Sequence, residues 1–119
     1  MPIRRGDVFR VDLNPVKGSE QAGRRPVVVI QNDVGNEAAP TVIVAPLTTK
    51  GFTKQYPINV HVPRGVAGLK ENSTVLLSQI RTIDNTRLDR KIGHLPPIYL
   101  KQVDQAICIS LGLSGSRSY

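Results

Sequence analysis

The sequence predicts a small, mainly β domain that ends in one α-helix. Short stretches with alternating or β-branched apolar residues recur along most of the chain, separated by loops with Gly, Pro, Asn and Asp. Near the C-terminus the apolar spacing changes to that of a helix. The 119 residues fit one domain that can bury a core without disulfides. We therefore expect hairpins and meanders of an antiparallel sheet.

About five strands are expected from these patterns. In the first, Phe9, Val11 and Leu13 alternate with Arg10 and Asp12, which indicates a strand with one buried face. The last is the longest. The expected ranges are 9–13, 26–31, 41–47, 58–62 and 73–82.

A C-terminal helix is expected to begin near Pro97, a residue that suits the first helical turn. One helical face is apolar and should pack on the sheet; it consists of Leu100, Val103, Ile107 and Leu111. Gly112 is expected to end the helix. A short helix is also expected over residues 82–87. The domain should span residues 1–113, with 114–119 as a flexible tail.

The composition indicates a basic protein. Sixteen Lys and Arg against nine Asp and Glu give a formal charge of +7, which favours binding to polyanions, although an inert basic surface would show the same excess. Cys108 is the only cysteine, so an internal disulfide is excluded, and neither a metal site nor a cofactor is expected. Because the sequence shows neither a secretory signal nor a membrane span, we expect a cytoplasmic location.

A polar loop over residues 18–26 carries one acid and two arginines and leads directly into an apolar strand. Charged side chains on a loop framed by glycines can contact a ligand. Pro26 disfavours helical backbone at the preceding residue, so Arg25 should be extended and held at the start of the sheet.

Further motifs accompany this loop along most of the chain. They are Arg5–Val8, Asp12–Pro15, Val29–Asp33 and Gln79–Asp84. Together with the loop, and in this order, they resemble the MazF/PemK family of toxin endoribonucleases. The resemblance implies an SH3-like small barrel of the kind shared with CcdB toxins. It also implies a homodimer with two sites flanking a shared groove, and a cognate acidic antitoxin that occupies this groove.

The activity implied by the resemblance is sequence-selective, metal-independent cleavage of single-stranded RNA. Attack by the 2′-hydroxyl would leave a 2′,3′-cyclic phosphate and a 5′-hydroxyl. By motif, the family's catalytic pair corresponds to Arg25 and Thr48. A guanidinium stays charged, so Arg25 is better suited to clamping the phosphate than to transferring protons. Proton removal is then left to Glu20 or to water.

Each catalytic candidate also has a plainer interpretation. Arg25 could be a solvated charge at the start of a strand, Glu20 a loop carboxylate that offsets Arg24 or Arg25, and Thr48 a turn residue. His61 and His94 invite an acid–base ribonuclease. Neither matches a catalytic position of the family, so we expect structural or solvated roles for both.

Polar residues in the family-like loop and near strand ends are candidates for contacting RNA bases and phosphates. They are Ser19, Gln21, Arg24, Asn32, Thr49, Lys50, Gln79 and Arg81, with Phe52 as a stacking surface. Asn32 could equally serve a turn, and Arg81 could pair with Asp84. Two other functions remain open at this point, a CcdB-like DNA gyrase inhibitor that acts by binding and a noncatalytic RNA-binding barrel.

Overall fold

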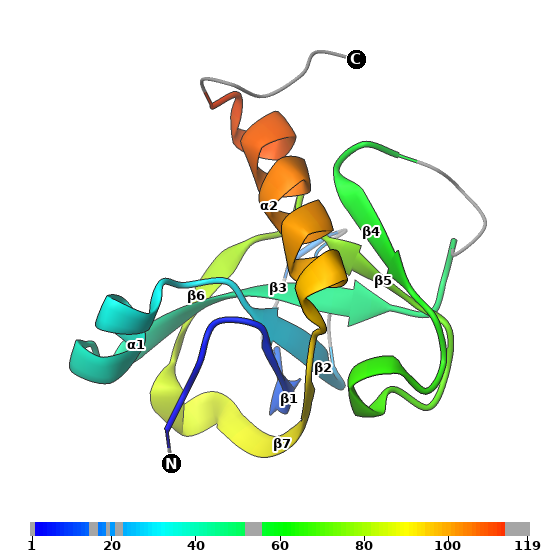
Figure 1. Cartoon of the computed structure of the whole chain (residues 1–119). Coiled ribbons are helices and arrows are strands. Elements are labelled where there is room, and N and C mark those ends of the chain that lie inside the picture. Colours follow the sequence, from blue (N-terminus) through cyan, green and yellow to red (C-terminus); the bar gives the residue numbers. More distant parts are fainter. Residues whose placement is uncertain (1, 15–16, 19, 21–22, 52–55, 114–119) are drawn as a thin grey trace.

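The computed structural model describes residues 2–14, 17–18, 20, 23–51 and 56–113 (Figure 1). Within these residues it contains an antiparallel sheet of seven strands and a C-terminal helix, which confirms the expected mainly β fold. The strands are β1 (Asp7–Asp12), β2 (Arg24–Val29), β3 (Thr41–Thr48), β4 (Asn59–Val62), β5 (Ser73–Leu76), β6 (Arg81–Asp84) and β7 (Leu88–His94). The helices are α1 (Asp33–Ala38), α2 (Pro97–Leu111) and the 3₁₀ turns η1 (Val66–Gly68) and η2 (Asn85–Arg87).

The sheet has the strand order β4-β5-β3-β2-β1-β7, and β6 also pairs with β3. One edge of β3 pairs with β2. The other edge is shared, because residues 41–44 pair with β6 and residues 47–48 pair with β5. The single strand expected over 73–82 is therefore wrong. A turn closed by the Gln79 N–H, which donates to the Leu76 carbonyl at 3.1 Å, divides it into two strands that both pair with β3.

Two elements lie where no regular structure was expected. β7 is an edge strand whose middle residues are charged and exposed, so it lacks the apolar alternation of a half-buried strand. α1 is only six residues long and occupies a segment that reads as a loop. The short helix expected over 82–87 is correct only at its end, since residues 82–84 belong to β6 and η2 begins at Asn85.

The C-terminal helix is confirmed between Pro97 and Leu111, and Gly112 ends it in the left-handed conformation at φ +66°. Val103 is buried, and Leu100 and Ile107 pack against the core. Leu111 is 59% exposed, so the apolar face ends before the last turn. In Figure 1, α2 lies across the sheet beside β4.

The sheet buries aliphatic residues on both faces. Val8 and Val28 point into a cluster that includes Val103 and Ala106 of α2, whereas Phe9 and other alternate residues point into a second cluster. One face of β1 and β2 is thus covered by α2 at one end. Arg10 lies two residues after Val8 on the same face of β1, and it is exposed.

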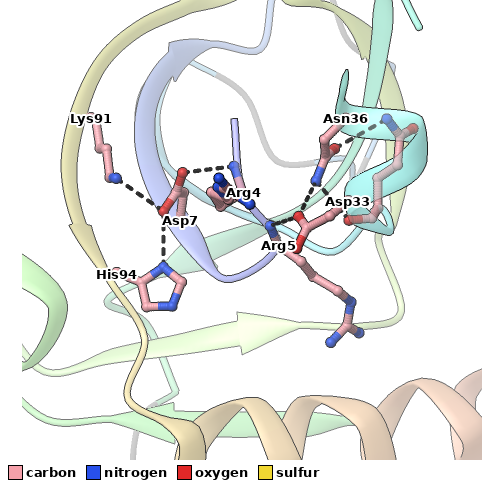
Figure 2. Close-up of polar contacts among 8 residues, drawn as sticks. Arg4, Arg5, Asp7, Asp33, Asn36, Lys91 and His94 are labelled. Carbon is pink, nitrogen blue, oxygen red and sulfur yellow. Dashed lines mark hydrogen bonds and ion pairs between the residues drawn. The ribbon is translucent and has the colours of Figure 1, made fainter. Parts of the chain in front are cut away.

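A buried carboxylate ties the N-terminal segment to β7 (Figure 2). Asp7 is fully buried and accepts a hydrogen bond from the Arg4 N–H at 2.9 Å. Its other oxygen contacts His94 Nδ1 at 2.9 Å and Lys91 Nζ at 3.2 Å. These contacts satisfy both carboxylate oxygens, so Asp7 holds β1 and β7 together at the sheet edge.

A second polar cluster joins the same N-terminal segment to α1 (Figure 2). The Arg5 N–H donates to Asp33 at 2.7 Å, and the Asn36 amide donates to the same oxygen at 3.1 Å. The hydrogen bond from the Arg5 N–H lowers the pKa of the Asp33 carboxyl below its usual value, and the hydrogen bond from Asn36 has the next largest effect. The Arg5 guanidinium also pairs with Asp104 of α2 at 2.7 Å.

Candidate active site

A cationic pocket of about 330 Å³ lies where β2 begins and β3 ends. Its walls also come from β1, β7 and the segment between η1 and β5. Among the described residues its lining has five cationic side chains and one carboxylate, that of Glu71. The lining residues are Arg10, Arg24, Arg25, Pro26, Leu47, Thr48, Thr49, Gly68, Leu69, Lys70, Glu71, Ser73, Arg90 and Ile92.

Arg25 is the second residue of β2, so the extended backbone expected from Pro26 is confirmed. Its side chain lines the pocket and is partly buried. Nη1 donates to the Leu47 carbonyl at 3.3 Å, on the neighbouring strand β3. This contact directs the guanidinium toward the end of β3.

Thr48 is the last residue of β3 and is 7% exposed. Its Oγ1 accepts a hydrogen bond from the Lys50 N–H at 3.2 Å. A hydroxyl has one proton and two lone pairs, so accepting this bond leaves its proton available to donate. Pro46 lies between the β3 residues that pair with β6 and those that pair with β5, where its missing N–H is tolerated. The pocket therefore contains a fixed cation and a fixed hydroxyl donor.

Of the other candidates in the described residues, Arg24 and Thr49 also line the pocket, while Glu20, Lys50, Asn32, Gln79 and Arg81 are outside its lining. Glu20 accepts a hydrogen bond from the Lys17 N–H at 2.6 Å within its own loop. Lys50 contributes its backbone N–H to Thr48. Ser19, Gln21, Phe52 and the tail 114–119 lie outside the described residues.

Asn32 and Arg81 have structural partners. The Asn32 side chain caps α1 by accepting from the Gly35 N–H at 2.8 Å. Arg81 Nη1 donates to the Leu13 carbonyl at 3.1 Å. In the described part of the chain no ion pair joins Arg81 to Asp84, whose carboxylate accepts from Thr86. Both side chains therefore have hydrogen-bond partners within the protein.

The pocket also contains charged residues that sequence reasoning missed. They are Arg10, Lys70, Glu71 and Arg90. Arg10 alternates with the buried residues of a predicted strand, so the sequence pattern was sufficient to predict that its side chain points outward. Arg90 belongs to the unpredicted β7, and only the pairing of β7 with β1 brings it to the pocket.

Neither histidine lines the pocket. His94 bonds to the buried Asp7, as Figure 2 shows. His61 Nδ1 lies 3.0 Å from Thr74 Oγ1 on the neighbouring strand β5. Both contacts fit the structural roles expected from the sequence.

The described residues contain no group of three His, Cys, Asp or Glu side chains arranged to hold a metal ion. None of the helices in these ranges combines the length and apolar character needed to cross a bilayer.

The fold and the pocket define a basic β domain with a cationic pocket that also contains a buried threonine hydroxyl. Residues 4–111 match the family described as the PemK-like, MazF-like toxin of type II toxin-antitoxin systems. The chain is 49% identical to Endoribonuclease MazF of Staphylococcus saprophyticus over 117 residues, which covers 98% of each chain. The chain belongs to this PemK-like, MazF-like toxin family.

Solved structures support the same fold. MazF from Deinococcus radiodurans superposes with a TM-score of 0.81 at 24% identity, covering 95% of this chain and 99% of that one. A MazE-MazF structure from the same organism gives a TM-score of 0.75 at 26% identity, covering 96% and 99%.

Proposed function

We propose that this chain is a toxin endoribonuclease that cuts single-stranded RNA sequence-selectively and without a metal, with Arg25 and Thr48 as its catalytic residues. The proposal rests on one observation: Arg25 and Thr48 come from two different strands and line the same cationic pocket. The name of the relative at 49% identity, Endoribonuclease MazF, agrees with this activity.

The chemistry is an in-line transfer within the substrate. The 2′-oxygen forms a bond to the neighbouring phosphorus, and the bond from that phosphorus to the 5′-oxygen breaks, which leaves a 2′,3′-cyclic phosphate and a 5′-hydroxyl. Arg25 binds the nonbridging oxygens as charge develops on them, and the Thr48 hydroxyl donates a hydrogen bond to one of them.

Two protons must move during this reaction. The leaving 5′-oxygen takes one from solvent, and the 2′-hydroxyl gives one to Glu20 or to water. Glu20→Gln distinguishes these acceptors, because removing a general base commonly lowers the rate about 10²- to 10⁴-fold. The glutamine can still accept the Lys17 hydrogen bond, so the loop contact is kept.

The family membership also supplies partners. We propose that a cognate acidic antitoxin silences the enzyme, that the active form is a homodimer, and that both act in the cytoplasm, where RNA is available. A formal charge of +7 suits both an RNA substrate and an acidic inhibitor. A MazE-MazF structure exists for the relative from Deinococcus radiodurans.

The test is incubation of the pure protein with a long single-stranded RNA in excess EDTA. We expect cleavage at a limited set of sequences. A substrate with 2′-deoxyribose 5′ to the cut should resist cleavage, because its nucleophile is missing. Binding without cleavage would favour a noncatalytic RNA-binding protein, and cleavage of the deoxy substrate at the normal rate would require an attacking water.

A further inference from the structure

Arg10 of β1 and Arg90 of β7 face each other directly across the antiparallel ladder. Residues in register on neighbouring strands project from the same side of the sheet, and like charges in this position destabilise it. Both side chains are exposed and both line the cationic pocket. The fold thus places two guanidinium groups together at a cost in stability.

The carboxylates near this pair are engaged elsewhere or are too few to neutralise it. Asp12 of β1 accepts from the Asn14 N–H at 3.0 Å, and Asp89 of β7 lies 3.9 Å from Arg24. Lys70 adds a third cation, next to Glu71, the carboxylate of the lining. Among the described residues, no ion pair involves Arg10, Arg90 or Lys70. Their charge therefore remains available to an external anion.

The same pocket contains Arg25 and Thr48, so the anion at Arg10 and Arg90 must be compatible with the substrate in the proposed function. RNA carries a phosphate at every nucleotide, and a strand that presents one phosphate to Arg25 must pass its neighbours along the adjoining wall. Guanidinium groups bind phosphate oxygens in bidentate geometry. A backbone phosphate next to the scissile one has the negative charge that this wall attracts, and it lies at the place along the strand where the wall adjoins Arg25.

On the basis of the proposed function, we propose that Arg10, Arg90 and Lys70 form a second phosphate subsite, which binds an RNA backbone phosphate next to the one held by Arg25 and Thr48. The subsite carries no base information, because its groups are cations that contact the backbone. It tightens RNA binding and fixes the register of the strand on the catalytic pair.

The test measures binding of an RNA oligonucleotide that contains the cleavage sequence, with 2′-deoxyribose at the cut to prevent turnover. Arg10→Gln and Arg90→Gln should each raise Kd about tenfold and should lower the slope of log Kd against log salt by about 0.7. On cleavable RNA, kcat/KM should fall by the same factor through KM. Lys101→Gln removes one charge from α2, outside the pocket lining, and is the matched control.

Arg90→Glu separates a ligand-binding role from a structural one. It replaces a repulsive cross-strand pair by an attractive one, so Tm should rise by about 2 °C while RNA affinity falls further than in Arg90→Gln. If Arg90 had a structural role instead, the Arg90→Glu variant would lose both thermal stability and RNA binding.

Three outcomes would count against the proposal or its basis. RNA affinities of the Arg10 and Arg90 variants equal to that of Lys101→Gln would overturn the subsite. Weakened binding of a polyglutamate peptide with unchanged RNA binding would overturn it in favour of an acidic polypeptide site. Failure of the wild-type protein to cleave RNA would instead refute the proposed function, and this is a separate readout.

Discussion

Replacing Arg25 by alanine should abolish RNA cleavage and leave the fold intact. The bond from Nη1 to the Leu47 carbonyl is 3.3 Å long, beyond the usual range of about 2.7–3.2 Å, and the side chain is only partly buried. Its loss should cost about 1 kcal/mol or less. For a domain of this size that lowers Tm by at most about 3–6 °C.

The effect on catalysis should be much larger. Loss of a donor aimed at developing negative charge commonly costs about a hundredfold or more in rate, or about 2.7 kcal/mol of transition-state stabilisation. The assay is single-turnover cleavage at saturating RNA, with a thermal melt followed by circular dichroism in parallel. The two readouts separate a catalytic loss from unfolding.

Arg24→Ala is the matched control, because it removes the same charge from the adjacent residue. The Arg24 side chain is 70% exposed, and its ion pair within the described residues is a 3.9 Å contact with Asp89. We expect less than about a tenfold loss of rate, since an exposed charge acts mainly through a screened field. Equal losses in both variants, or near wild-type cleavage by folded Arg25→Ala, would refute the assignment of Arg25.

Three further predictions follow from the charge distribution. An acidic peptide should compete with RNA for the region of Arg24, Arg25 and Lys50, so it should raise KM and leave kcat unchanged. The affinity of the peptide should also fall as the salt concentration is raised. Inhibition that depends on neither the RNA concentration nor the salt concentration would place the peptide's site elsewhere, such as on α2. Asp7→Asn should lower the free energy of unfolding by about 1–2 kcal/mol in urea titrations, because the charge-assisted bonds to Arg4, Lys91 and His94 weaken while the two side-chain partners stay accessible to water; an unchanged midpoint would contradict this. The lowered pKa of Asp33 contributes stability that is present above its usual value of 3.8 and is lost as pH falls through the lower pKa of the folded state; thermal melts across this pH range should show a smaller loss of stability at acid pH for Asp33→Asn than for the wild type, and parallel curves would contradict the linkage.

Local patterns were sufficient for much of the fold. The alternation of Phe9, Val11 and Leu13 located β1, and the helical spacing after Pro97 located α2, because both elements bury one face against the core. The extended backbone at Arg25 could be predicted from Pro26 alone. The family-like motifs then directed attention to Arg25 and Thr48, which the structure brings into one pocket.

What the sequence could not provide depends on contacts between distant segments. The apolar pattern runs through Leu76, Leu77 and Ile80, which hides the turn between β5 and β6. β7 has no apolar alternation, and its partner β1 lies at the other end of the chain. The Arg10–Arg90 pair exists only through that register, so no local pattern could have placed these two charges side by side.

The pairing of β1 with β7 also has a consequence during synthesis on the ribosome. The pocket takes Arg10 from the start of the chain and Arg90 from a strand made much later. Until residues 88–94 have left the exit tunnel, β1 lacks its neighbour on that edge and one wall of the pocket is missing. Translation proceeds at about 5–20 residues per second, so the nascent toxin spends seconds with an incomplete site. The completed wall, and the RNA binding that we propose for it, therefore arise only after β7 has emerged and paired with β1.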